Sequence, residues 1–133
     1  MFERIVTAVD GSECADRAVD LAAELGAEVV VVHLAETIAA WTVATRAETP
    51  EEATWLADGA VRRLKDRGVS ARAEVRGAVR GTVPHGIVEV AEEEDAGLIV
   101  MGSRGLGDVT GLLLGSVAHK VLSLSHVPVL IAK

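Results

Sequence analysis

The sequence has few aromatic residues and a single cysteine. Half of its 133 residues are hydrophobic, yet only Phe2, Trp41 and Trp55 carry aromatic rings. A core without such rings must be filled by Val, Leu, Ile and Ala, a composition typical of parallel strands buried between helices. The lone Cys14 cannot form an internal disulfide, and it falls in an expected helix. We interpret it as a buried packing residue of a protein in a reducing compartment.

Positive charge and long hydrophobic segments are also scarce. The chain has 13 Lys and Arg against 20 Asp and Glu, a formal net charge of −7, which repels nucleic-acid backbones and anionic lipids. No segment approaches the roughly 18 apolar residues of a membrane span, and no signal-like segment precedes the first apolar run. We therefore expect one cytoplasmic domain, residues 1–133, that binds neither nucleic acid nor membrane.

Strand-like and helix-like segments alternate along the chain. Segment 35–48 has no regular pattern, and we interpret it as a flap. Apolar runs predict strands at 5–9, 29–34, 98–101 and 127–131. Alternation of apolar and charged residues predicts a further strand at 69–76. Helical spacing, capping residues and glycine stops predict helices at 13–25, at 49–68, from 82 to the acidic run 92–95, and at 115–125.

Five strands alternating with four helices predict an α/β fold, a single-domain parallel sheet with helices on both faces. Binding sites of such sheets form at the carboxyl ends of the strands, where neighbouring crossovers diverge. The residues alone leave the strand order open. If the first and fourth strands are neighbours, Asp10 and Gly102 line that crevice together.

A glycine-rich loop near the C-terminus carries most of the functional interpretation. Gly102 and Gly105 follow the predicted strand at 98–101, and Gly115 precedes the last helix. Glycines let main-chain N–H groups approach an anion closely, and a helix start adds an electropositive end. The loop between Gly105 and Gly115 is long enough to wrap a triphosphate. The sequence therefore predicts a nucleotide phosphate site here.

Other phosphate and metal motifs do not fit the chain. No Gly-Lys-Ser or Gly-Lys-Thr occurs, which excludes a Walker-type NTPase. The run that begins Gly105-Leu-Gly107 places its third glycine at Gly111, one residue late for a dinucleotide fingerprint, and the following strand has no acidic residue. The four histidines show no metal-ligand spacing.

Two residues near the loop have alternative interpretations. Asp10 could accept hydrogen bonds from a ribose hydroxyl or an adenine amine, or it could cap the first helix. Arg104 could place a cation over the phosphates, or it could be an exposed loop arginine.

The spacing Gly102-x2-Gly105-x9-Gly115-Ser116, together with Asp10, resembles the ATP-binding branch of the universal stress protein family. The resemblance spans the whole chain, since residues 5–12, Gly81-x2-Pro84 and residues 128–131 also agree. It implies an adenine nucleotide alpha hydrolase-like fold with the strand order 3-2-1-4-5.

The same resemblance implies where ATP binds. Mg²⁺ or Mn²⁺ could arrive with the triphosphate and take most of its ligands from phosphate oxygens and water. Ala118 departs from the pattern, because relatives can carry a hydroxyl residue there. The implied contacts are Ala8, Val9 and Asp10 around the adenosine, Leu34 against the adenine, Met101, Gly102, Arg104 and Gly105 at the ribose and phosphates, and Gly115, Ser116 and Val117 at the phosphate tail.

The final strand predicts a partner. In the implied order the third and fifth strands are the sheet edges; the third carries alternating charges, whereas the fifth exposes Val127, Val129, Leu130 and Ile131. Antiparallel pairing of this strand with its twin would give a symmetric homodimer, as the resemblance also implies. The alternative is that helices and the chain end cover this edge.

No residue is evident as the base that would orient an attacking water. We therefore expect a nucleotide-binding regulatory protein of stress response rather than an enzyme, with hydrolysis slow or absent. The alternatives are a nucleotide-independent scaffold or interaction module of the same fold, and a slow ATP hydrolase.

Overall fold

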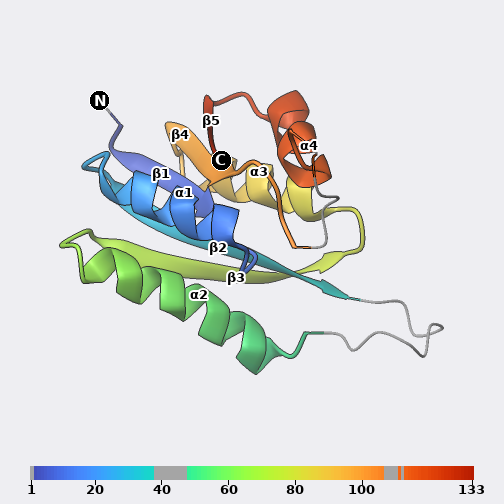
Figure 1. Ribbon diagram of the computed structural model, residues 1–133, viewed down its shortest axis with the longest axis horizontal. Helices are drawn as coiled ribbons and strands as arrows, with labels where there is room; N and C mark the ends of the chain where they lie inside the picture. Colours follow the sequence, from blue (N-terminus) through green and yellow to red (C-terminus); the bar gives the residue numbers. More distant parts are fainter. Residues whose placement is uncertain (1, 38–47, 107–110, 112) are drawn as a thin grey trace.

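A computed structural model describes residues 2–37, 48–106, 111 and 113–133 (Figure 1). Strands and helices alternate along the chain, as the sequence predicts. The strands are β1 (Arg4–Ala8), β2 (Glu28–Thr37), β3 (Ala71–Val79), β4 (Leu98–Gly102) and β5 (Val129–Ala132), and the helices are α1 (Glu13–Ala23), α2 (Pro50–Lys65), α3 (Val83–Glu93) and α4 (Ser116–Leu124).

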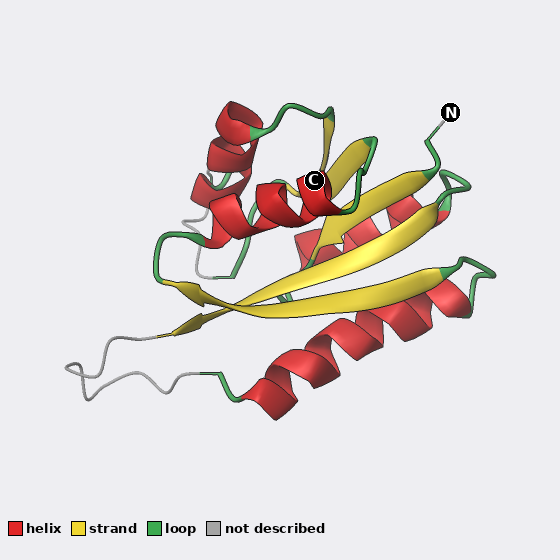
Figure 2. Ribbon diagram, turned by 180° about the vertical axis from the view of Figure 1, so that it is seen from behind, coloured by secondary structure: helices red, strands yellow, loops and turns green. Residues whose placement is uncertain are grey.

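The five strands form one parallel sheet in the order β3-β2-β1-β4-β5, which confirms the predicted fold and makes β1 and β4 neighbours. Residues of α1 and α2 pack on one face of the sheet, and residues of α3 and α4 pack on the other. Figures 1 and 2 show the resulting three layers from opposite sides.

The core consists of two apolar clusters separated by the sheet. Along β2, Val29 and Val31 belong to the α1–α2 side, whereas Val30 and Val32 belong to the α3–α4 side. Because successive side chains of a strand point to opposite faces, a continuous run of Val is what a strand buried on both faces requires. Cys14 is buried and free, as predicted.

Two helix starts form where their capping residues predict. The Ser12 side chain accepts a hydrogen bond from the Ala15 amide at 3.2 Å and begins α1. Thr49 and Glu52 form a reciprocal capping box at the start of α2, with Pro50 in the first turn. Such caps satisfy helix amides that have no partner within the helix.

β2 and β3 are longer than the sequence predicts. β1 ends its pairing with β2 at Ala8 and Val32, but β2 and β3 stay paired as far as Thr37 and Val79. The apolar run predicts an end of β2 at residue 34, yet backbone pairing with β3 continues through polar residues. Residues 35–37 of the predicted flap therefore belong to β2. Residues 38–47 lie outside the described residues, so the flap stays a prediction.

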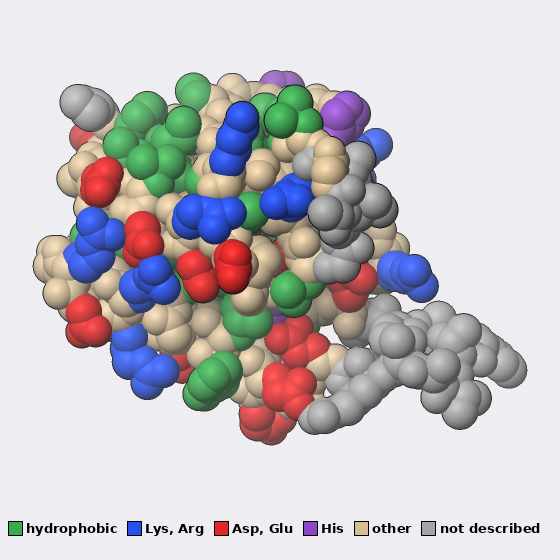
Figure 3. Space-filling model, in the orientation of Figure 1, with side chains coloured by type: hydrophobic (Ala, Val, Ile, Leu, Met, Phe, Trp, Pro, Cys, Tyr) green, Lys and Arg blue, Asp and Glu red, His purple; other side chains and the backbone are tan. Residues whose placement is uncertain are grey.

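The two edge strands differ in charge. Arg72 of β3 forms ion pairs with Glu94 and Glu74, and Arg76 pairs with Glu93 at 2.5 Å. On β5, Val129, Leu130 and Ile131 are half-buried, and the strand itself begins at Val129 rather than at the predicted residue 127. Acidic and basic side chains intermingle over much of the face in Figure 3. None of the described helices combines the length and hydropathy of a membrane span.

Candidate functional site

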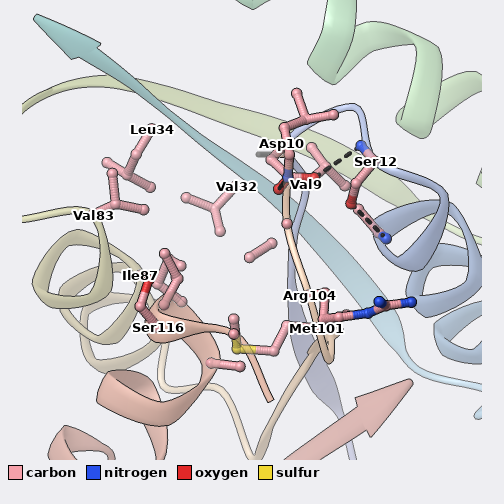
Figure 4. Close-up of a pocket in the computed structure, with 18 of the residues that line it drawn as sticks. Val9, Asp10, Ser12, Val32, Leu34, Val83, Ile87, Met101, Arg104 and Ser116 are labelled. Carbon is pink, nitrogen blue, oxygen red and sulfur yellow. Dashed lines mark hydrogen bonds between the residues drawn. The ribbon is translucent and has the colours of Figure 1, made fainter. Parts of the chain in front are cut away.

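A cavity of about 490 Å³ lies at the carboxyl ends of β1 and β4 (Figure 4). This is the place where the crossover from β1 to α1 and the loop that follows β4 leave the sheet in different directions, as the fold class predicts. Its volume is in the range of small-molecule sites. All eleven residues predicted as ligand contacts line it: Ala8, Val9, Asp10, Leu34, Met101, Gly102, Arg104, Gly105, Gly115, Ser116 and Val117.

One side of the cavity is apolar. Val32 and Leu34 come from β2, Val83 and Ile87 from the first turns of α3, and Met101 from β4. Figure 4 shows Leu34, Val83, Ile87 and Val32 together, away from Asp10 and Arg104. Neither Val83 nor Ile87 is among the contacts predicted from the sequence. The available signal was the helical spacing of the two residues, because Val83 lies within Gly81-x2-Pro84 and Ile87 follows it by one turn. Such a surface suits a flat, uncharged ring.

Gly86 determines how far Leu34 can withdraw from the cavity. A Cβ atom at Gly86 would lie 2.7 Å from Cδ1 and 3.1 Å from Cγ of Leu34. Because these distances are shorter than van der Waals contact, the side chain of Leu34 occupies the space that a larger residue at position 86 would need. The depth of the apolar side therefore depends on this glycine.

The start of α4 is the electropositive part of the cavity. Gly115 is the N-cap residue and has no side chain to accept a hydrogen bond from the helix. The amides of Ser116, Val117 and Ala118 are in the first turn, where N–H groups have no partner within the helix, and all three residues line the cavity. The amide of Gly115 itself donates to the carbonyl of Ser103 at 2.5 Å and shapes the loop.

Gly102 has a packing role that the sequence analysis missed. A Cβ atom here would lie 2.6 Å from Cβ and 2.7 Å from the carbonyl carbon of Cys14. The glycine therefore allows the first turn of α1 to approach the end of β4. This approach brings the start of α1 and the glycine loop together at the cavity.

Asp10 connects the two loops beside the cavity. Its Oδ1 accepts from the Ser12 amide at 2.9 Å, and its Oδ2 accepts from the Leu106 amide at 3.2 Å. Ser12 rather than Asp10 provides the side-chain cap of α1. The interpretation of Asp10 as the cap of α1 is therefore wrong. Its contact with a ribose or an adenine stays a prediction.

The Arg104 side chain is directed toward α1 rather than toward the apolar side of the cavity (Figure 4). Burial raises the pKa of the nearby Cys14 thiol, but hydrogen bonds to Ser103 and the Arg104 backbone, with the charges of Arg17 and Arg104, outweigh this effect. The net pKa of the thiol is lowered from its usual value. The contact of Arg104 with phosphates stays a prediction.

Several cavity residues have no counterpart in the predicted site. Glu48 lines the cavity, and its carboxylate contacts the buried ring of His33. It lies directly before the capping box of α2, in a segment whose sequence pattern gave no indication of a contact with β2. The residues missed at this site are Ser12, Ala15, Val32, Glu36, Glu48, Val83, Ile87, Ser103 and Leu106.

Comparison with known proteins agrees with this architecture. The model of the universal stress protein family matches residues 1–133. The universal stress protein YxiE of Bacillus subtilis is 32% identical to this chain, with all of both chains covered. A universal stress protein from Archaeoglobus fulgidus, solved in complex with dAMP, is 32% identical with a TM-score of 0.73, covering 98% of each chain.

A further solved structure, of a universal stress protein in complex with cAMP, is 28% identical with a TM-score of 0.73; it covers 99% of this chain and 97% of the other. The fold, the glycine loop and the full-length matches lead to one conclusion. The chain belongs to the universal stress protein family.

Proposed function

We propose that the protein binds an adenine nucleotide in the cavity at the ends of β1 and β4. The observation that carries this proposal is the pairing, within one cavity, of an apolar side with a helix start that has no side-chain cap. An adenine ring needs the first and a phosphate needs the second. The complexes of related proteins with dAMP and cAMP support the same ligand class.

The proposed orientation follows from this polarity. The base lies against Leu34, Val83 and Ile87, and the ribose lies near Asp10 and Gly102. The phosphates lie at the first turn of α4. We propose ATP as the ligand, with Mg²⁺ or Mn²⁺ held mainly by phosphate oxygens and water. Ala118 provides its main-chain amide but no hydroxyl, which leaves one donor fewer than a Ser or Thr would supply.

The role of the α4 amides can be tested by isothermal titration calorimetry with ATP, ADP, AMP and cAMP. Ser116 is the first residue of α4, where proline is well tolerated, and Gly115 has the extended conformation that precedes proline. Ser116→Pro therefore removes one N–H donor and keeps the helix. Ser116→Ala is the matched control that keeps the amide.

We expect Ser116→Pro to weaken ATP binding at least tenfold relative to Ser116→Ala, because a hydrogen bond to a charged group contributes about 1.5 kcal/mol or more. Equal ATP affinity of the two variants would contradict the proposed phosphate position. Absence of binding by the wild-type protein to all four nucleotides would favour the nucleotide-independent scaffold.

We further propose that the protein binds the nucleotide without hydrolysing it rapidly. We also propose that it acts in the cytoplasm, a reducing compartment in which its single cysteine would stay a free thiol. Asp108, the acidic residue of the glycine loop, lies outside the described residues. Release of inorganic phosphate from ATP should stay at the background rate. Release that depends on the protein, and that Ser116→Pro diminishes, would instead identify a slow hydrolase.

A homodimer through β5 is the second part of the proposal. The carbonyls of Pro128 and Ala132 accept from the amides of Ile99 in β4 and of Ser103 directly after it. The alternate residues Val129 and Ile131 therefore direct their main-chain groups to the open edge. Proline at position 129 would remove an edge donor without breaking pairing with β4. We expect light scattering to give a dimer for the wild type and a folded monomer for Val129→Pro. A monomeric wild type would contradict the dimer.

A further inference from the structure

We propose that His33 and Glu48 share one proton, and that this proton sets the affinity of the cavity for anionic ligands. The proposal concerns a buried histidine and a carboxylate at the wall of the cavity, neither of which the sequence motifs identify. The part that concerns ligand affinity rests on the proposed nucleotide binding, whereas the part that concerns the proton does not.

Both ring nitrogens of His33 face oxygen acceptors. The side chain is only 6% exposed. Nδ1 lies 2.8 Å from the carbonyl oxygen of Val9, and Nε2 lies 2.9 and 3.0 Å from the two carboxylate oxygens of Glu48. Because the residue is buried, few water molecules can replace either contact.

This geometry fixes the number of protons. A carbonyl oxygen can only accept, so Nδ1 of His33 must carry a hydrogen. If the ring were neutral, Nε2 would then present a lone pair to the carboxylate of Glu48, and the two would repel each other. A second proton is required between Nε2 and Glu48. Because imidazole is a stronger base than a carboxylate, this proton lies on His33, which is then an imidazolium.

The other charged groups on the surrounding elements do not replace Glu48 as the partner of the ring. β3 places Val75 opposite His33, so the charged neighbours of Val75 point to the other face of the sheet. Asp10 accepts hydrogen bonds from the amides of Ser12 and Leu106, and Glu52 belongs to the capping box with Thr49. Glu36 is exposed further along β2, and Glu74 and Arg76 form an ion pair with each other.

The pair is connected to the cavity on two sides. Val9 lines the cavity and is held to β2 by two hydrogen bonds. Its amide donates to the Val32 carbonyl at 2.9 Å, and its carbonyl accepts from His33. Glu48 also lines the cavity. A neutral ring keeps its contact with Val9, so loss of the proton acts mainly on Glu48.

The consequence for a ligand is electrostatic. Asp10, Glu36 and Glu48 all line the cavity. While His33 is charged, it neutralises Glu48, and loss of the proton adds one uncompensated negative charge at the wall. An anionic ligand should therefore bind more weakly to the protein that has lost this proton than to the protein that carries it. By linkage, binding of the anion should favour uptake of the proton.

The proton can be tested without a ligand, by long-range ¹H–¹⁵N spectra of the histidine rings between about pH 5 and 9, with the His33 signals identified by their loss in His33→Gln. The wild-type ring should carry hydrogens on both nitrogens at low pH. In Glu48→Gln the side-chain amide can donate to a neutral ring, so His33 should become neutral at a lower pH. A ring that is neutral throughout, or the same titration in both proteins, would overturn the shared proton.

The effect on the cavity is tested by the affinity for cAMP over the same pH range. A cyclic phosphodiester has no second ionisation, so its own charge stays constant. Wild-type affinity should fall about fivefold from low to high pH, the size expected for one unit charge in a partly solvated cleft. Glu48→Gln should bind cAMP at all pH values with about the low-pH affinity of the wild type.

Glu36→Gln is the matched control, because it removes a carboxylate from the same cavity but not from His33. It should raise cAMP affinity and keep the pH dependence. Adenosine, which has no phosphate, should show little pH dependence with any variant. If cAMP affinity in the wild type did not change with pH, the effect on the cavity would be refuted. If cAMP did not bind at all, the proposed function would fail, and the ring spectra would still decide the proton.

Discussion

Two glycines of this protein lie so close to neighbouring residues that an added Cβ atom would clash, whatever the backbone conformation. At Gly86 the contact is with the end of the Leu34 side chain, which can rotate. At Gly102 it is with Cβ and the main chain of Cys14, which cannot move without moving α1. The same substitution should therefore affect binding at one position and stability at the other.

We expect Gly86→Ala to lower the affinity for adenosine and ATP about tenfold, equivalent to about 1.4 kcal/mol, because Leu34 is pushed into the apolar side of the cavity. Stability should not fall, since Ala is favoured over Gly within a helix by up to about 1 kcal/mol. Calorimetry and urea unfolding of the same variant would measure both quantities.

Gly102→Ala is the contrasting variant. It should lower the free energy of unfolding by roughly 1 to 3 kcal/mol, because overpacking here displaces backbone. A Gly86→Ala protein that lost stability but bound ligand normally would contradict the role assigned to Leu34.

At the scale of the elements, α1 and α2 are joined by a group of ion pairs around Asp20. Arg63 of α2 reaches both carboxylate oxygens at 2.6 Å, and Arg67 donates to the Asp20 carbonyl at 3.1 Å. The hydrogen bond from Arg63 lowers the pKa of Asp20 below its usual value, although burial opposes the shift. All three side chains are partly exposed, so solvent screening limits the energy of the group.

We expect Asp20→Asn to cost about 0.5 kcal/mol of unfolding free energy at pH 7. A carboxyl with a lowered pKa in the folded state stabilises the protein above its unfolded pKa, and this contribution disappears as the pH falls through the folded pKa. The difference between wild type and variant should therefore shrink from about pH 5 toward pH 2. Urea unfolding at a series of pH values would measure it, and a difference that grew on acidification would contradict the assignment.

The elements themselves were largely predictable, and the reasons are local. The Val run of β2, the capping box at Thr49 and the helix start at Ser116 each depend on neighbouring residues, so they are visible in the sequence. The ends of β2 and β3 were not predicted, because they depend on pairing between two strands that are distant along the chain. The same distinction explains the site. The glycine loop is a local pattern, whereas Val83 and Glu48 reach the cavity only through the fold.

At the scale of the whole molecule, the strand order is what assembles the cavity. Because β1 and β4 are central neighbours, residues near position 10 and near positions 102–118 meet at one end of the sheet. The apolar side comes from β2 and α3, on the side toward β3. The motif thus supplies the proposed phosphate end, and the topology supplies the proposed base end.

The extension of β2 and β3 beyond β1 predicts where a ligand should alter hydrogen exchange. Residues 33–37 pair with 75–79 but have no strand β1 beside them (Figure 1). A base packed against Leu34 would add the contacts that this region lacks. We expect amide exchange at 33–37 and 75–79 to slow about tenfold on nucleotide binding. Slowing confined to α4 would place the ligand only at the phosphate end.

This extension also has a mechanical consequence. Within the sheet, this extension of β2 is paired on one edge only, whereas β4 lies between β1 and β5, so we expect the wall that it forms to be the more compliant one. Bases of different width could be accommodated by bending this ribbon without disturbing the core. The phosphate end, fixed to α1 and α4, would stay rigid. The protein would then discriminate ligands by their charge more strictly than by the shape of their ring.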